Sequence, residues 1–278
     1  MDLNWLESIL FGLVSGLSDI LPVSAQAHKL LMMKFFGITR EPRLLRLLIH
    51  VSILGAVYYN CMPQIVKIIR AKSLSRIPKR RRKRPLDVKS LMDFRLWQTM
   101  VVPVVLVYLC YEKISALHSS LILMAVLLFV NGIILYIPPF LPGSNKDSRN
   151  LSRVEGVLMG LGGAASVLPG ISGVGAAVSI ASVTGVERSY GLNMVLLMHL
   201  AVTAALIVFD ILAIISGGIE VLNFGIFLSY LLSAAAAFLG TTVAVRIMRM
   251  LAAEKGYASF AYYCWGVALF TFLLNLLA

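Results

Sequence analysis

Residues 12–28, GLVSGLSDILPVSAQAH, place a polar break inside a long apolar run, and this break decides the predicted fold. Pro22 interrupts the run, and Asp19, Ser24 and His28 surround the interruption. In lipid every backbone N–H and C=O group needs a partner, so a broken helix at membrane depth occurs only where protein or a water-filled cavity surrounds it. The simpler alternative is an ordinary spanning helix that is kinked at its proline.

The composition identifies an integral membrane protein. Of the 278 residues, 59% are hydrophobic and only 14% are charged. The mean hydropathy is +0.87, a value that excludes a water-soluble domain of this length. No basic residue precedes the first apolar run, so we do not expect a cleaved signal peptide. The three cysteines lack metal-ligand spacing and are interpreted as small apolar core residues.

Six apolar runs reach the length of about 20 residues that a spanning helix needs. They cover roughly 44–62, 96–114, 119–140, 190–216, 221–244 and 257–278. Two further stretches, roughly 3–36 and 151–186, are each interrupted at a Leu-Pro pair, and we interpret both as re-entrant helical hairpins. The predicted fold class is an all-α integral membrane protein with two such hairpins and six transmembrane helices, in one membrane domain over residues 1–278.

The basic residues predict the orientation in the membrane. They concentrate in the loop at about 63–95, which contains the run KRRRKR at 79–84. Because Lys and Arg favour cytoplasmic loops, we predict that this loop is cytoplasmic and that both termini lie outside. Beside membrane spans, the expected partner of this charge is anionic lipid, not nucleic acid. The connector with Arg40, Arg43 and Arg46 is an exception, since this topology places it outside.

An inverted repeat follows from the same count of spans. Each predicted hairpin precedes three spans, which gives repeats of about 1–140 and 151–278, and SGLSDILP at 15–22 aligns with GGAASVLP at 162–169. The two hairpins would enter from opposite sides, so we expect their tips to meet. In secondary transporters, such repeats place substrate sites at discontinuous helices, with helix N-termini directed at anions. Close packing of small residues is the alternative explanation of the glycines near the second break.

Both hairpins resemble motifs of the undecaprenyl pyrophosphate phosphatase (bacitracin-resistance) family. Residues 15–28, SGLSDILPVSAQAH, resemble the first family motif, roughly Glu-Gly-x-Thr-Glu-Phe-Leu-Pro-Val-Ser-Ser-x-Gly-His. Residues 169–177, PGISGVGAA, resemble the second motif, Pro-Gly-x-Ser-Arg-Ser-x-x-Thr. Downstream, GVER at 185–188 is similar to the family's Gly-Val-x-Arg, and IHVS at 49–52 is loosely similar to the segment that opens its first full span.

This resemblance implies a function. The family removes the terminal phosphate from a C55 polyprenyl diphosphate at the outer side of the bacterial cytoplasmic (inner) membrane, which recycles the lipid carrier of peptidoglycan synthesis. The implied catalytic residues are His28 as base or nucleophile, Asp19 as orienting acid or metal ligand, and Ser24 as a phosphate-oxygen donor. The implied cofactor is a divalent cation, Mg²⁺ or Ca²⁺, for which Asp19 is the candidate ligand.

The second motif supplies the implied phosphate-binding residues. Ser172 is the expected phosphate-oxygen donor, and Gly170 and Gly173 belong to the predicted anion-facing turn. Gly173 stands where the family has arginine, and an arginine that neutralises charge in phosphoryl transfer contributes about 10³–10⁵ in rate. Lys29 is the nearest candidate in sequence for a substitute cation, with a lysine that reaches the membrane interface as the alternative.

Other departures leave two functional hypotheses open. Ser15 and Ala25 replace the first glutamate and the second paired serine of the first motif, and Val174 and Ala177 replace the serine and threonine of the second. The first hypothesis is a divergent phosphatase of reduced activity. The second is a non-catalytic polyprenyl-phosphate binding protein or flippase. Under both, the partner is a polyprenyl phosphate or diphosphate lipid; under neither does the sequence fix the oligomeric state. For His28, a merely structural hydrogen bond is a further alternative.

Overall fold

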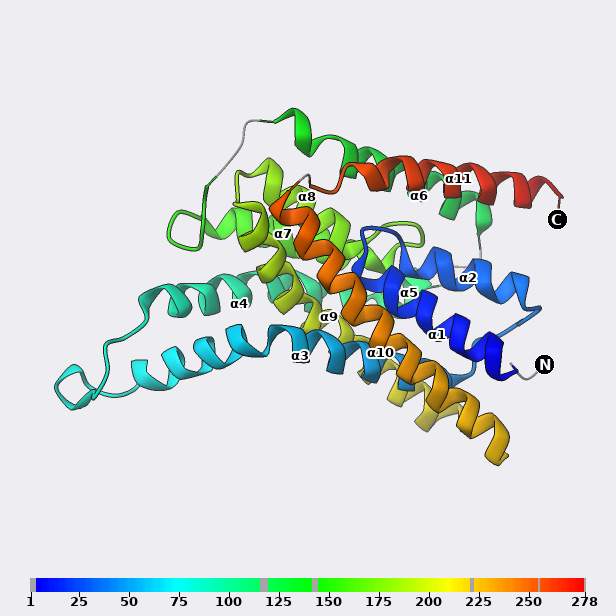
Figure 1. The fold of residues 1–278 in the computed structure, drawn as a ribbon, viewed down its shortest axis with the longest axis horizontal. Coiled ribbons are helices and arrows are strands. Elements are labelled where there is room, and N and C mark those ends of the chain that lie inside the picture. The colour runs from blue at the N-terminus through cyan, green and yellow to red at the C-terminus, as the bar shows by residue number, and fades with distance from the viewer. Residues whose placement is uncertain (1–3, 116–119, 142–144, 221–222, 255, 278) are drawn as a thin grey trace.

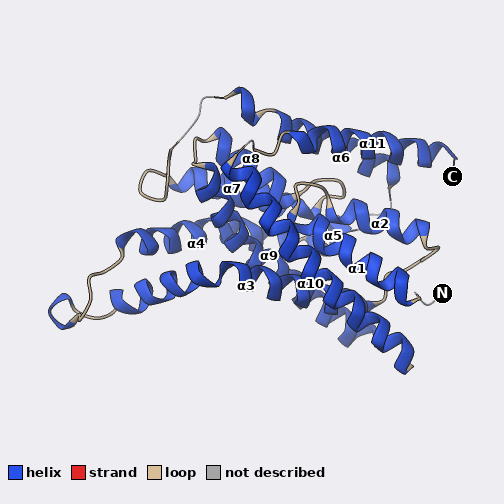
Figure 2. Cartoon of the chain, viewed as in Figure 1, coloured by secondary structure: helices blue, strands red, loops and turns tan. Residues whose placement is uncertain are grey.

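The computed structural model describes residues 4–115, 120–141, 145–220, 223–254 and 256–277, in which α-helices form the architecture (Figures 1 and 2). The all-α fold class is therefore confirmed. In chain order the helices are α1 (Trp5–Ile20), α2 (Ala25–Phe35), α3 (Arg43–Ser75), α4 (Val88–Tyr108), α5 (Tyr111–Ser115), α6 (Leu121–Tyr136), α7 (Arg153–Ala164), α8 (Gly173–Val183), α9 (Arg188–Gly217), α10 (Phe224–Ala253) and α11 (Ser259–Leu277).

Within these described ranges, six helices are long and apolar enough to cross a membrane: α3, α4, α6 with its following turn, α9, α10 and α11. The predicted number of spans is therefore confirmed, and the chain is a multi-pass membrane protein. Several boundaries differ from the prediction. Helix α3 continues past residue 62 to Ser75, α4 begins at Val88, before residue 96, and ends at Tyr108, before residue 114, and α10 continues past residue 244 to Ala253. Hydropathy marks only the lipid-facing part of a helix, whereas Lys, Arg and Leu favour helix beyond it.

Each of the two predicted hairpins consists of two helices that are broken at the expected Leu-Pro pair. The first is α1 and α2, and the second is α7 and α8. In Figure 1, α1 and α2 extend from their turn toward the end that holds both termini. The chain that enters α7 and the chain that leaves α8 pair with each other at Lys146 and Val186, so this hairpin also returns to its starting side. Their re-entrant passage through a bilayer stays a prediction.

The caps of the four hairpin helices repeat in the same order. Asn4 before α1 and Ser152 before α7 each form a capping box, in which a side chain satisfies a helical N–H group and a glutamate satisfies the cap N–H group. Ser24 caps α2 and Ser172 caps α8. The beginnings of all four helices are therefore specified by local sequence.

Small residues bring α1 close to the long helix α10. Gly12 and Gly16 of α1 lie against the backbone carbonyl groups of Ser233 and Ala237, where a Cβ atom would not fit. Such close approach of glycine faces is a common mode of helix packing in membranes. It fixes α1 against the bundle, and thereby the position of Asp19 at the end of α1.

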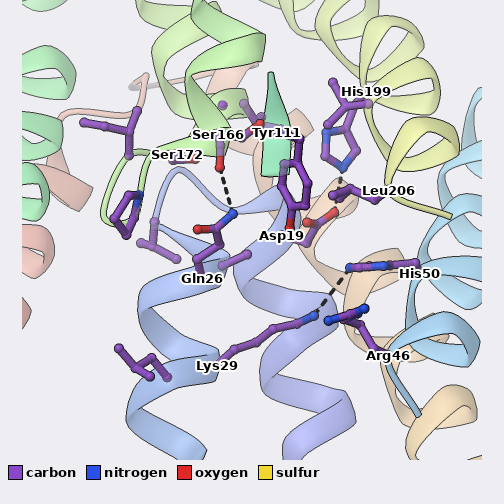
Figure 3. Close-up of a pocket in the computed structure, with 18 of the residues that line it drawn as sticks. Asp19, Gln26, Lys29, Arg46, His50, Tyr111, Ser166, Ser172, His199 and Leu206 are labelled. Atoms are coloured by element: carbon purple, nitrogen blue, oxygen red, sulfur yellow. Dashed lines mark hydrogen bonds and ion pairs between the residues drawn. The ribbon is translucent and has the colours of Figure 1, made fainter. Parts of the chain in front are cut away.

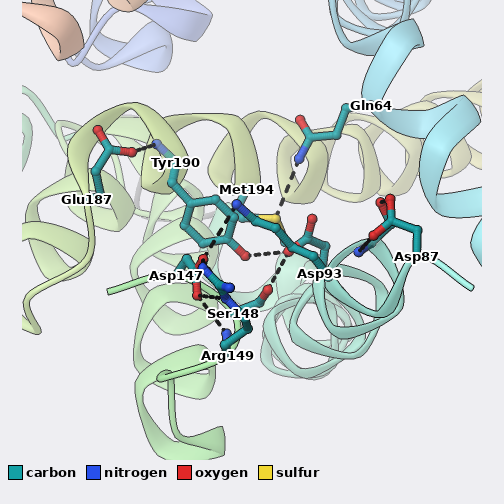
Figure 4. A network of polar contacts seen from close by, with 11 residues as sticks. Gln64, Asp87, Asp93, Asp147, Ser148, Arg149, Glu187, Tyr190 and Met194 are labelled. Atoms are coloured by element: carbon teal, nitrogen blue, oxygen red, sulfur yellow. Dashed lines mark hydrogen bonds and ion pairs between the residues drawn. The ribbon is translucent and has the colours of Figure 1, made fainter. Parts of the chain in front are cut away.

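A polar network ties α4, the connector before α7 and α9 together (Figure 4). The start of α4 lies at the end of the molecule opposite the termini (Figure 1). Ser148 Oγ and Tyr190 Oη both donate to Asp93 Oδ1, at 2.6 and 2.8 Å. In the same connector, hydrogen bonds from Arg149 lower the pKa of Asp147 to about 2. Figure 1 places the basic loop between α3 and α4 at this end as well.

Candidate functional site

The tips of the two hairpins lie against each other, as predicted, and their capping serines join them. Ser24 Oγ accepts a hydrogen bond from the Gly170 N–H group at 3.1 Å. Ser172 Oγ donates to the Leu21 carbonyl oxygen at 3.3 Å. Each serine therefore caps its own helix and also contacts the opposite hairpin, so the two tips form one unit.

Asn131 of α6 holds the same junction from the other side. Its Nδ2 group donates to the Pro22 carbonyl oxygen at 3.1 Å, and its Oδ1 atom accepts from the Ser172 N–H group at 2.9 Å. The side chain is completely buried. A buried amide whose donor and acceptor are both used fixes the relative position of the groups it binds.

A cavity of about 200 Å³ lies beside the joined tips and is bounded by both hairpins, α3, α5 and α9. Figure 3 shows its polar side chains converging from these elements. Cationic, imidazole and hydroxyl groups dominate this polar lining, which also contains two carboxylates. The polar lining residues are Asp19, Gln26, Lys29, Glu41, Arg46, His50, Tyr108, Tyr111, Ser166, Ser172 and His199. This composition suits an anionic ligand.

Asp19 pairs with a histidine on α9. Its Oδ2 atom lies 2.6 Å from His199 Nε2, and the two side chains are 14% and 6% exposed. Ionisable groups at membrane depth are expensive unless paired, and they mark functional sites. The structure therefore places Asp19 in the cavity, as predicted.

A second His-carboxylate pair joins α3 to α9, and its histidine also lines the cavity. His50 Nδ1 lies 2.5 Å from Asp210 Oδ2, and Arg46 Nε donates to Asp210 Oδ1 at 2.6 Å. If His50 Nδ1 carries the proton that Asp210 accepts, Nε2 is left as the acceptor. Lys29 Nζ lies 3.4 Å from that Nε2 atom. This arrangement gives one histidine with a fixed orientation and a basic nitrogen on the cavity side.

Lys29 faces the cavity and does not reach away to a membrane interface. Besides His50, it contacts Glu41, whose Oε1 atom lies 3.3 Å from Lys29 Nζ. Arg46 comes from the connector whose arginines are the exception to the predicted charge distribution. The cavity thus contains two permanent cations, contributed by α2 and α3.

The prediction that His28 faces the Asp19 cavity is wrong. Its Nδ1 atom contacts the Ser24 carbonyl oxygen at 2.7 Å, and its Nε2 atom contacts Tyr263 Oη of α11 at 2.7 Å. It lines a separate apolar groove of about 400 Å³ between α1, α2 and α11. The physical reason is helical phase: His28 and Lys29 are neighbours in α2, and adjacent residues on a helix point in different directions.

The other predicted site residues divide between the cavity wall and the junction. Ser172 and Gly173 line the cavity. Ser24 is fully buried in the junction, and Gly170 lies there as well, with a positive φ of 108° that favours glycine. A Cβ atom at Gly173 would lie 2.5 Å from the Gly163 carbonyl oxygen, so the backbone here has no room for the arginine of the resembled motif.

The donor set does not form a protein cage for a divalent metal. Ca²⁺ takes six to eight oxygen ligands, whereas Mg²⁺ is usually held by one or two carboxylates together with water and substrate phosphates. The two carboxylates that line the cavity, Asp19 and Glu41, are already paired with His199 and Lys29. Among the residues that the structure describes, no group of three or more His, Cys, Asp or Glu side chains is placed to hold an ion. That Asp19 binds a metal stays a prediction, because no such group of ligands in the described residues includes it.

The site residues that sequence reasoning missed include four ionisable residues inside or at the edge of predicted spans. A rule that treats every ionisable group in an apolar run as functional would have found them. They are Arg46, His50, His199 and Asp210.

Comparisons with known proteins agree with this architecture. A family described as "Bacitracin resistance protein BacA" matches residues 8–270. Relatives include undecaprenyl-diphosphatase of Methanobrevibacter smithii, 28% identical over 96% of each chain. Undecaprenyl-diphosphatase 1 of Shouchella clausii is 25% identical over 98% of this chain and 97% of its own length. Undecaprenyl-diphosphatase of Thermosipho africanus is 26% identical over 97% of this chain and 100% of its own. Because the match spans nearly the whole sequence, this chain belongs to the bacitracin resistance protein BacA family.

Proposed function

We propose that the protein is an undecaprenyl-diphosphatase-type hydrolase of the cytoplasmic membrane, which releases the terminal phosphate from a polyprenyl diphosphate. Family membership and the names of the relatives support this function. The single observation that carries the proposal is the His50–Asp210 pair, whose histidine lines one cavity together with the two cations Lys29 and Arg46. A group that transfers protons and groups that neutralise phosphate charge are the requirements of phosphate ester hydrolysis.

In the proposed complex, the diphosphate binds between Lys29 and Arg46. Both side chains line the cavity. An ion pair with Glu41 holds Lys29 in place, and an ion pair with Asp210 holds Arg46. The N-terminal end of α8, at Ser172 and Gly173, also borders the cavity and adds the positive end of a helix dipole. These groups replace the charge that the motif arginine would supply.

His50 is the proposed general base. A water molecule attacks the terminal phosphorus atom, and its oxygen forms a bond to phosphorus while the bond to the bridging oxygen breaks. His50 Nε2 accepts the proton of the water, and Asp210 stabilises the resulting imidazolium through Nδ1. The products are inorganic phosphate and the polyprenyl monophosphate. No step of this sequence uses a metal.

The apolar groove that contains His28 is the proposed path of the prenyl chain. Val23 lines both this groove and the charged cavity, so the two are adjacent at the hairpin tip. Leu17, Leu31 and Phe260 are among its apolar walls. A diphosphate in the cavity would therefore have its first isoprene units beside α1, α2 and α11.

Phosphate release by the purified protein tests the proposal. With C55 diphosphate as substrate, His50→Gln should lower kcat by about 10²–10⁴, the usual contribution of a general acid–base group. His28→Gln is the matched control for kcat, because its imidazole lies outside the cavity in the proposed path of the prenyl chain, so this variant should change KM and keep most of kcat. Greater loss in His28→Gln would restore the sequence-based assignment. Assays in EDTA and in Mg²⁺ measure the metal requirement separately.

A second candidate function is non-catalytic binding or flipping of polyprenyl phosphate. Ala25 and Gly173, which stand in place of a motif serine and arginine, favour this alternative. It predicts that the wild-type protein binds the C55 diphosphate without releasing phosphate. Under that outcome, Lys29→Gln and His50→Gln should weaken lipid binding. Neither the wild-type protein nor the variants would release phosphate.

A further inference from the structure

A second cavity lies at the end of the molecule opposite the termini, away from the charged site. Its volume is about 580 Å³, and its walls come from the end of α6, from α8, from the start of α9 and from the end of α10 with the following turn. None of its lining residues lines the first cavity. The proposed hydrolysis therefore does not explain this cavity.

The two cavities are built from corresponding elements of the predicted inverted repeat. The first cavity uses the second helix of its hairpin (α2) and the start of the next long helix (α3). It also uses the aromatic residues at the end of α4 and just after it, Tyr108 and Tyr111. The second uses the second helix of its hairpin (α8), the start of α9 and the region at the end of α10, which includes Tyr257. The predicted inverted repeat therefore makes the second cavity the counterpart of the first.

Two buried hydroxyl groups in its wall lack partners. Ser179 and Tyr257 are only 3% and 6% exposed, and among the residues that the structure describes neither Ser179 Oγ nor Tyr257 Oη has a hydrogen-bond partner. Buried polar groups are normally satisfied, because an unmade hydrogen bond in the interior is unfavourable. Both residues line the cavity, so a ligand there can supply the missing acceptor.

The cavity also contains a free cation. Arg188 is exposed and lines it, and makes no hydrogen bond or ion pair with another residue in the described part of the chain. The neighbouring carboxylate of Glu187 is committed to capping α9, because it accepts from the N–H groups of Ser189 and Tyr190 at 2.9 and 2.6 Å. The remaining walls include Leu135, Pro138 and Pro139, which are apolar.

We propose that this second cavity binds a phosphate group that enters from the side of the basic loop. Arginine with hydroxyl donors recognises phosphate oxygens by charge-assisted hydrogen bonds. The phosphate has two sources, the headgroup of a prenyl monophosphate or free phosphate, and the apolar wall beside Arg188 suits the first. This binding requires no hydrolysis, so it stands apart from the proposed activity.

Protection of an introduced cysteine tests the proposal on the full-length protein. Ala253 is exposed and lines the cavity, so Ala253→Cys is the reporter, in a Cys110→Ala background that removes the exposed native thiol. The rate of reaction with N-ethylmaleimide is measured against increasing geranylgeranyl monophosphate, inorganic phosphate or geranylgeraniol. Ser182→Cys is a second reporter in the same cavity if the first does not fold.

The proposal expects protection by a phosphate-bearing probe. Arg188→Gln should weaken the apparent affinity about tenfold or more, as expected for one charge-assisted hydrogen bond. Arg153→Gln is the matched control, because Arg153 is also an exposed first residue of a helix but does not line the cavity. Tyr257→Phe, which keeps the ring, should weaken affinity to a smaller extent and replaces Arg188→Gln if that variant does not fold.

The probes distinguish the sources. Protection by geranylgeranyl monophosphate alone identifies a lipid headgroup, and equal protection by inorganic phosphate identifies a soluble ligand. Four results would overturn the proposal: no protection by either phosphate, equal protection by geranylgeraniol, protection that persists in Arg188→Gln, or protection that is lost equally in Arg153→Gln.

Discussion

At the scale of single residues, the site consists of paired ionisable groups in an apolar protein. Asp210 is 4% exposed on its side chain and binds both His50 and Arg46. A charge buried at this depth is stable only with such partners, and its removal leaves the partner charges uncompensated. The pairing therefore serves stability and also sets the tautomer of His50.

The same scale explains why the motif arginine has no place in this chain. Gly173→Arg should lower stability by about 1–3 kcal/mol, the usual effect of overpacking, because its Cβ atom would meet the Gly163 carbonyl oxygen and Ser166 Cβ at 2.5 and 2.7 Å. The rate of phosphate release should not rise, since Lys29 and Arg46 already supply the charge.

Thermal unfolding and phosphate release measure these two effects. Gly173→Ala is the control for the steric part, since it adds the same Cβ atom without a charge, and it should be destabilised comparably. A gain of activity in Gly173→Arg over Gly173→Ala would contradict the assignment of Lys29 and Arg46.

At the scale of helices and hairpins, one serine at each tip has two structural functions. Ser24 Oγ accepts from the Ala27 N–H group as a helix cap and from Gly170 of the other hairpin. Ser172 combines the same two functions in reverse. The tips are therefore joined directly by hydrogen bonds.

The double role of Ser24 predicts an unusually large effect of its removal. Ser24→Ala should destabilise the protein by about 2–3 kcal/mol, since the lost cap contributes about 1 kcal/mol and the unpaired, buried Gly170 N–H group adds more. Ser120→Ala is the matched control, because Ser120 caps α6 locally through Leu123 and should lose only the cap. Unfolding in a mild detergent measures both; equal losses would show that the bond between the tips contributes nothing.

At the scale of the whole molecule, both termini lie at one end of the long axis and the basic loop lies at the other (Figure 1). This arrangement agrees with the orientation predicted from the distribution of Lys and Arg. The charged cavity lies toward the end of the termini, and the second cavity lies toward the basic loop. The inverted repeat that relates them stays a prediction.

Cysteine labelling in intact cells tests this orientation. In a Cys110→Ala background, a membrane-impermeant maleimide should not label Arg82→Cys in the basic loop. It should label Ile219→Cys, an exposed position in the turn after α9 at the opposite end. The reverse pattern would invert the topology and place the charged cavity on the cytoplasmic side.

Local signals in the sequence determined the class of protein, the six spans and the two breaks. Apolar runs, proline and capping residues act over a few neighbours, so they need no knowledge of the fold. The resembled motifs likewise indicated the hairpin tips and Asp19. They did not distinguish His28 from Lys29, because which side of α2 faces the cavity depends on how the hairpin packs.

Only the tertiary structure decided which ionisable groups share the site. His50 and Asp210 are separated by 160 residues, and Asp19 and His199 by 180. They meet because α3 and α9 pass beside the joined tips, an arrangement set by packing between distant helices. A single sequence contains the residues of such a site but not their distances.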